Sequence, residues 1–182
     1  MPGLEQRCQR IELLLSDVDG VLTNGGVVFD NQGIESKRFH IRDGLGIKLW
    51  QRAGGKFGII TGRASHIVKL RAAELGIELI RQGIEDKWLT VRQLMSELQL
   101  QPEQVAFIGD DLPDRPVMMN VGLGIAVADA AEDVRQAAHH VTTLSGGYGA
   151  VREAVEMILR KQGRWQDLLQ RYGGTGESPS SQ

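Results

Sequence analysis

Short apolar runs rich in β-forming residues alternate with segments of helical period along most of this 182-residue chain. In the helical segments, apolar residues such as Ile67, Leu70 and Leu75 recur at the spacing of one helix face. This alternation is typical of parallel strands joined by crossover helices. We therefore predict an α/β fold with a Rossmann-like, doubly wound parallel sheet, whose strands lie at residues 11–16, 56–60, 78–81, 105–108 and 124–127.

The chain is long enough for one well-buried domain, and neither a linker nor an internal repeat divides it. We expect this single domain over residues 11–172, after an N-terminal extension at 1–10. The turn signal "DNQG" separates two β-like runs and predicts a projecting β-hairpin over about residues 25–40. Residues 173–182 have no apolar content to bury and are predicted to be disordered.

Charge and cysteine content exclude several kinds of protein. The formal net charge is −2, so the chain lacks the global basic field that draws proteins onto nucleic acids or anionic membranes. The only cysteine is Cys8, which rules out an internal disulfide and a cysteine-based metal cluster. No apolar run has the length of a signal peptide or of a bilayer span, so we expect a soluble, cytoplasmic protein.

Polar and acidic residues follow three of the predicted strands. Ligands of doubly wound sheets bind beyond the carboxyl ends of the strands, so these residues are the candidate site. They are Asp17 and Asp19 after the first strand, Thr61, Gly62 and Arg63 after the second, and Asp110, Asp111 and Asp114 after the fourth.

This set of side chains favours metal-assisted phosphoryl transfer. Residues two apart in an extended segment point to the same side, so Asp17 and Asp19 can face one substrate. Clustered carboxylates take up protons unless a cation lies among them, and ligands that are all oxygen favour Mg²⁺. One carboxylate can attack phosphorus to give an aspartyl phosphate, while the other protonates the leaving alcohol and then activates water.

The motifs resemble those of the haloacid dehalogenase-like phosphatases. "DVDGVLT", "ITGR", Lys87 in "EDKW" and "GDDLPD" occur in the order and spacing of that family's four motifs. "FHIRDGLGIKLW" and "SGGYGAVREAVEMIL" are similar to its small capless branch, which dephosphorylates sugar acids; the resemblance covers roughly residues 11–160. It implies a magnesium-dependent phosphoric monoester hydrolase that acts on an eight- or nine-carbon sugar acid phosphate in lipopolysaccharide precursor biosynthesis.

The resemblance also implies roles for the acidic residues. Asp17 would be the nucleophile and a Mg²⁺ ligand. Asp19 would be the general acid and base, and a ligand through its backbone carbonyl. Asp110 would be the third protein ligand. Asp111 and Asp114 would support the metal ligands without contacting the metal themselves.

The phosphoryl group and the sugar acid would bind through further residues. Thr61 and Lys87 would hold the phosphoryl group. Arginine suits the sugar-acid carboxylate because its planar fork matches carboxylate geometry. By resemblance, the substrate-binding set is Asp19, His40, Gly44, Leu45, Gly46, Ile47, Lys48, Gly62, Arg63, Arg71 and Lys87. At His40 the family pattern leads us to expect asparagine.

The spacing of the motifs leaves no room for a separate cap domain. About forty residues separate Asp19 from Thr61, and about twenty-five separate Thr61 from Lys87. The site must therefore be covered from elsewhere, and the hairpin at residues 25–40 is placed to reach a neighbouring chain. The resembling enzymes are tetramers, which implies a homotetramer with sites at subunit interfaces.

Three alternatives stay open at this point. A calcium-binding loop is disfavoured because Gly20 follows Asp19 directly, whereas such loops carry glycine at the sixth position. A receiver-type signalling domain would carry its phosphoacceptor on a later strand. A non-catalytic module associated with a sugar-activating enzyme would not need Asp17, Asp19, Lys87 and Asp110 together.

Overall fold

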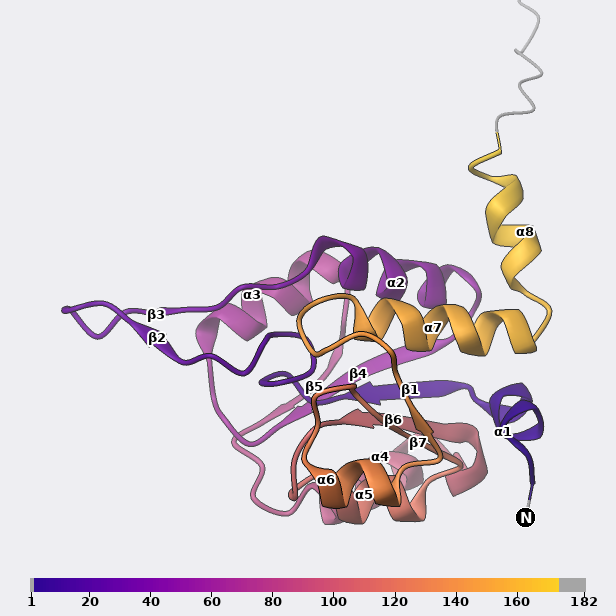
Figure 1. Ribbon diagram of the computed structural model, residues 1–182, viewed down its shortest axis with the longest axis horizontal. Coiled ribbons are helices and arrows are strands. Elements are labelled where there is room, and N and C mark those ends of the chain that lie inside the picture. Colours follow the sequence, from indigo (N-terminus) through magenta and orange to yellow (C-terminus); the bar gives the residue numbers. More distant parts are fainter. Residues whose placement is uncertain (1, 174–182) are drawn as a thin grey trace, which may run out of the picture.

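A six-stranded parallel sheet forms the centre of the computed structural model, which describes residues 2–173 (Figure 1). Its strand order is β5-β4-β1-β6-β7-β8, and each neighbouring pair is parallel. The strands are β1 (Leu13–Ser16), β4 (Lys56–Thr61), β5 (Leu79–Gln82), β6 (Val105–Gly109), β7 (Leu123–Ala126) and β8 (His140–Val141). The predicted fold class is confirmed, and the five predicted strands are present with ends shifted by one or two residues.

Helices cover both faces of the sheet, as Figure 1 shows. One layer contains α2 (Ile41–Arg52), α3 (His66–Leu75) and α7 (Ala150–Lys161). The other contains α4 (Lys87–Glu97), α5 (Arg115–Asn120) and α6 (Glu132–Ala137). All four residues of β1 are buried, which explains why this strand is a continuous apolar run rather than an alternating one.

The N-terminal residues add a helix that the sequence did not predict. Helix α1 (Leu4–Arg10) packs against α7 and the short 3₁₀ helix at Pro102–Gln104. Its Cys8 is fully buried, and burial raises the pKa of this thiol to about 11, so Cys8 is an unreactive core residue. The predicted extension at 1–10 therefore packs on the domain. At the other end, α8 (Trp165–Gln170) follows α7, and the predicted tail lies outside the described residues except for Gly173.

The predicted hairpin is present and extends from the body of the molecule (Figure 1). It pairs β2 (Val28–Phe29) with β3 (Glu35–Ser36) in antiparallel register. Its turn is held by Asp30, whose Oδ1 accepts hydrogen bonds from the backbone N–H groups of residues 32 and 34, both at 2.8 Å. Four apolar side chains of the hairpin are exposed on the single chain: Val27, Val28, Phe29 and Ile34.

Helix α7 is capped by a side chain from its neighbour α2. Oδ1 of the buried Asp43 accepts a hydrogen bond from the backbone N–H of Arg152 at 2.8 Å, which satisfies one of the free N–H groups at the start of α7. Gly46 allows the two helices to approach closely, because a Cβ there would come within 3.0 Å of the Cα of Arg152. The contact between α2 and α7 fixes the position of the loop at residues 145–149, which precedes α7.

That loop packs against the loop that follows β1. The backbone N–H of Gly147 donates to the carbonyl of Val21 at 2.9 Å. A Cβ on Gly146 would lie 1.7 Å from the carbonyl oxygen of Gly20, so only glycine fits there. The glycines of "SGGYG" therefore support the loop that carries the first acidic motif. Within residues 2–173, none of the helices is long and apolar enough to cross a membrane.

Candidate active site

A hollow of about 620 Å³ lies at the carboxyl ends of β1, β4 and β6. It brings together nine of the residues predicted from the sequence, which come from four separate segments of the chain. They are Asp17, Asp19, Thr61, Gly62, Arg63, Lys87, Asp110, Asp111 and Asp114. This is the location that the doubly wound topology predicts for a ligand site.

Asp17 and Asp110 come together because they follow adjacent parallel strands. The backbone N–H of Asp17 donates to the carbonyl of Ile108 at 3.0 Å, which continues the β1–β6 pairing into the site. Asp110 then packs closely on Gly20, where a Cβ would lie 1.9 Å from Oδ2 of Asp110. Gly20 also has φ of +90°, a conformation that favours glycine. The glycine after Asp19 thus makes room for the third carboxylate.

Lys87 lies between two of the carboxylates. Its Nζ is 3.0 Å from Oδ2 of Asp17 and 2.6 Å from Oδ1 of Asp114, and its side chain is only 3% exposed. Helix α4 begins at Lys87, and Asp86 caps that helix by accepting from the N–H of Leu89. Burial alone would lower the pKa of Lys87, but Asp114 and Asp17 outweigh it and raise this pKa. The lysine is therefore a fixed positive charge in the site.

Asp114 uses both of its oxygens within the protein. Oδ1 accepts from Lys87, and Oδ2 accepts from the backbone N–H groups of Asp110 and Asp111 at 3.0 and 3.4 Å. This carboxylate therefore organises the loop after β6. Asp114, Asp17 and Asp110 each place an oxygen within 4.8 Å of the others, but Asp114 has no oxygen left without a partner.

Asp17 and Asp110, in contrast, each retain a free oxygen. Oδ1 of both residues is buried and accepts no hydrogen bond from the residues that the structure describes. Burial, reinforced by Asp114, raises the pKa of Asp17 to about 6 and that of Asp110 to about 8. Without a cation, Asp110 retains its proton at neutral pH and Asp17 takes one up at slightly acidic pH; a bound cation would displace both protons. The acidic cluster has the donor set of a metal site.

The carboxylate of Asp19 is not part of this cluster and pairs with basic side chains instead. Its Oδ1 forms an ion pair with Lys37, and its Oδ2 lies 3.9 Å from Nη1 of Arg63. Glu35 joins the same group by accepting a hydrogen bond from Nη2 of Arg63 at 2.8 Å. No sequence motif marks Lys37 or Glu35 as site residues, because only folding of the hairpin brings them to the motif at Asp19.

The remaining predicted substrate residues do not line this hollow. They lie on or beside α2 and α3: His40, Gly44, Leu45, Gly46, Ile47, Lys48 and Arg71. Nδ1 of His40 caps α2 by accepting from the N–H of Arg42 at 3.2 Å. Gly44 makes room for Arg71, whose Nη2 would lie 2.4 Å from a Cβ at that position.

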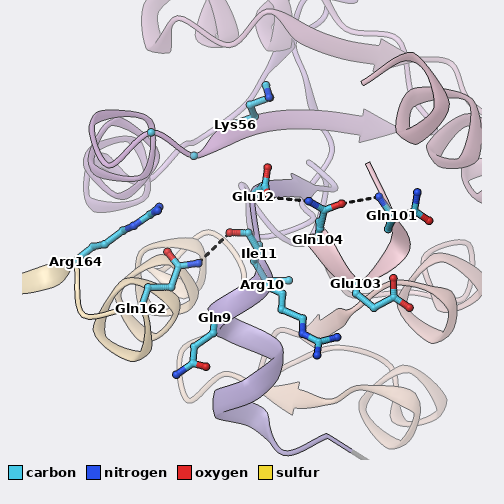
Figure 2. Close-up of a pocket in the computed structure, with 12 residues that line it drawn as sticks. Gln9, Arg10, Ile11, Glu12, Lys56, Gln101, Glu103, Gln104, Gln162 and Arg164 are labelled. Carbon is cyan, nitrogen blue, oxygen red and sulfur yellow. Dashed lines mark hydrogen bonds between the residues drawn. The ribbon is translucent and has the colours of Figure 1, made fainter. Parts of the chain in front are cut away.

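A second hollow, of about 530 Å³, lies at the opposite edge of the sheet, near the amino ends of β1, β4 and β6 (Figure 2). None of the predicted site residues lines it. Some of its polar groups bond to one another: Nε2 of Gln104 donates to Glu12 at 2.6 Å, and Nε2 of Gln162 donates to the carbonyl of Ile11 at 2.9 Å. The acidic hollow is therefore the candidate active site.

Comparison with known proteins identifies the family of this chain. A family profile described as haloacid dehalogenase-like hydrolase matches residues 71–153. The 3-deoxy-D-manno-octulosonate 8-phosphate phosphatase KdsC of Yersinia pestis is 47% identical over 173 residues, which cover 95% of this chain and 89% of that protein. The chain belongs to this phosphatase family, a branch of the haloacid dehalogenase-like hydrolases.

Solved structures show the same relationship for this phosphatase. The 3-deoxy-D-manno-octulosonate 8-phosphate phosphatase of Yersinia pestis aligns with a TM-score of 0.88 at 47% identity, over 90% of this chain and 88% of that one. The corresponding phosphatase of Moraxella catarrhalis, in complex with magnesium, phosphate and KDO, aligns with a TM-score of 0.91 at 39% identity, over 92% of this chain and 97% of that one.

Proposed function

We propose that this phosphatase hydrolyses 3-deoxy-D-manno-octulosonate 8-phosphate to 3-deoxy-D-manno-octulosonate and phosphate, as a step in lipopolysaccharide precursor biosynthesis. One observation carries the proposal: Asp17 and Asp110 each present a buried oxygen without a partner, beside the buried cation of Lys87. An anionic phosphoryl group and a divalent cation fit this arrangement of charge. The relatives' activity supplies the substrate.

We propose Mg²⁺ as the metal. Asp17, Asp110 and the backbone carbonyl of Asp19 would hold it, since the free carboxylate oxygens belong to Asp17 and Asp110 and oxygen ligands favour a hard cation. Asp111 and Asp114 would support the site, in keeping with the two backbone N–H groups that Asp114 binds. When bound, the cation would neutralise charge on the phosphoryl oxygens.

In the proposed mechanism, the protein's own residues carry the reaction in two steps. A carboxylate oxygen of Asp17 bonds to phosphorus as the bond from phosphorus to the sugar oxygen breaks, and Asp19 gives its proton to that oxygen. Asp19 then takes a proton from water, whose oxygen bonds to phosphorus while the bond to Asp17 breaks. Thr61, Gly62 and Lys87 would hold the phosphoryl oxygens throughout.

Recognition of the sugar acid is proposed to start at Arg63. This side chain is 40% exposed at the hollow, and a guanidinium can bind a carboxylate through two parallel hydrogen bonds. His40, Leu45, Lys48 and Arg71 keep some exposure outside the hollow of their own chain, so we propose that they serve a neighbouring subunit's site. Gly44, Gly46 and Ile47 are buried and would hold α2 in place for that contact.

We propose a homotetramer in which the hairpin reaches a neighbouring chain. Phe29 is 57% exposed on the single chain and lies among three other exposed apolar residues of the hairpin. Analytical ultracentrifugation should give four times the chain mass of 20.0 kDa. Phe29→Asp should shift the protein to smaller species, because the new carboxylate would be buried at the contact. A monomer at every concentration tested would contradict the assembly.

Phosphate release from a panel of sugar-acid phosphates, with added Mg²⁺, tests the proposed function. The octulosonate 8-phosphate should be the best substrate, and a chelator should remove activity that Mg²⁺ then restores. Preference for a nonulosonate 9-phosphate would assign the nine-carbon alternative. A stable phospho-Asp17 without turnover would indicate a receiver-like protein, and neither phosphorylation nor turnover would indicate a non-catalytic module. Turnover no better than that of simple esters would refute the substrate class.

A further inference from the structure

Lys37 lies just after β3, on the arm of the hairpin that returns to the body of the molecule. Four apolar residues of the hairpin are exposed, yet the side chain of Lys37 is only 1% exposed. Its Nζ forms an ion pair with Oδ1 of Asp19 and lies 3.3 Å from Oε1 of Glu35. A buried lysine needs an opposite charge beside it. The ion pair between Lys37 and Asp19 therefore links the hairpin to the loop after β1.

Glu35 fixes this arrangement to the body of the protein. Its Oε1 accepts from Nη2 of Arg63 at 2.8 Å, and its Oε2 accepts from Oγ of Ser65 at 2.6 Å. Chiefly because Ser65 donates to it, with Lys37 and Arg63 nearby, the pKa of Glu35 is lowered. Lys37 is therefore held between two carboxylates from different parts of the chain and has little freedom to move.

The ion pair distinguishes the two oxygens of Asp19. Oδ1 is occupied by Lys37, whereas Oδ2 accepts no hydrogen bond from residues 2–173 and has Nη1 of Arg63 at 3.9 Å. Asp19 is two residues from Asp17, so an unheld carboxylate could turn toward the cluster formed by Asp17 and Asp110. There it would compete for a cation or add repulsion.

We propose that Lys37 is a positioning residue for Asp19: by binding Oδ1, it keeps this carboxylate out of the acidic cluster and leaves Oδ2 as the oxygen that exchanges the proton. This inference rests on the proposed acid and base role of Asp19. The proton passes from Oδ2 of Asp19 to the leaving oxygen as the bond between that oxygen and phosphorus breaks. Asp17 forms the new bond to phosphorus. The return proton comes from the attacking water.

The test compares leaving groups. In Lys37→Met, kcat/KM for a simple alkyl phosphate should fall at least about tenfold more than for p-nitrophenyl phosphate, because an alkoxide needs a proton as it leaves and nitrophenolate does not. The ratio kcat/KM reports steps through departure of the leaving group, so slow hydrolysis of the phospho-enzyme does not hide the effect. A lysine that only fastens the hairpin would lower both values equally.

Further variants keep the comparison decisive. Ser65→Ala removes one hydrogen bond to Glu35 and does not touch Asp19. The ratio of kcat/KM for the alkyl phosphate to kcat/KM for p-nitrophenyl phosphate should therefore stay unchanged. Lys37→Arg retains the cation and should keep the ratio of the two kcat/KM values close to that of the wild type. Lys37→Gln, which also lacks the cation, serves as the test variant if Lys37→Met does not fold. Equal losses on both substrates, or no loss, would overturn the inference. Failure of the wild type on sugar-acid phosphates alone would overturn only the proposed substrate, because neither test substrate is a sugar acid.

Discussion

Asp17→Asn is expected to lower phosphate release by a factor on the order of 10⁴ or more, because the amide cannot attack phosphorus. The substitution should preserve the shape of the site. The amide oxygen can still accept from Lys87, which keeps its second partner, Asp114. Initial rates with saturating Mg²⁺ measure the loss. Turnover within tenfold of the wild type would place the nucleophile elsewhere.

The same variant should be more stable than the metal-free wild type at alkaline pH. Burial raises the pKa of Asp17 to about 6, above its value in an unfolded chain. The folded protein therefore binds the proton of the Asp17 carboxyl group more tightly than the unfolded chain does. Protonation of Asp17 stabilises the folded state at low pH, and this stabilisation is lost as pH rises from about 4 through 6. Thermal unfolding in chelator at pH 5 and pH 8 should show a smaller decrease for Asp17→Asn than for the wild type.

Asp133→Asn provides a matched control for both measurements. Asp133 is exposed on α6 and lies outside the acidic hollow, so the change in charge is the same but the environment is water. We expect the activity and the pH dependence of this variant to follow the wild type. A similar loss in Asp133→Asn would mean that net charge, not the site, controls the rate.

The fold was predictable because its strongest signals are local. A strand buried on both faces is a short apolar run, and "IELLLSD" and "QVAFIGD" mark where β1 and β6 end in acid. Helix α1 was missed because its sequence, "LEQRCQR", has only one buried residue and no apolar stripe. Strand β8 was missed because two residues carry no recognisable period.

The candidate site was predictable where it depends on strand ends, and less so where it depends on the hairpin and α2. Asp17, Thr61 and Asp110 come together as a consequence of strand order. Lys37 reaches Asp19 only because the hairpin folds back, which no periodicity encodes. The residues that the resemblance placed on α2 and α3 do not line the hollow of their own chain, and their predicted role stays a prediction.

Lys87→Met is expected to be the most destabilising substitution in the site. The side chain is a close match in volume, but it removes the cation between Asp17 and Asp114, both of which are buried. Removing one partner from a buried ion pair leaves an uncompensated charge and costs about 3–5 kcal/mol. Urea unfolding should show this decrease, and phosphate release should fall as well, since the phosphoryl group loses its fixed positive charge.

A second substitution separates charge from packing. If the unpaired carboxylates cause the instability, Lys87→Met combined with Asp17→Asn should recover part of the lost stability, because one of the two buried charges is removed. Lys69→Met, on an exposed position of α3, should change stability by no more than about 0.5 kcal/mol. If the double variant is as unstable as Lys87→Met alone, then the lysine stem, and not its charge, holds this part of the site together.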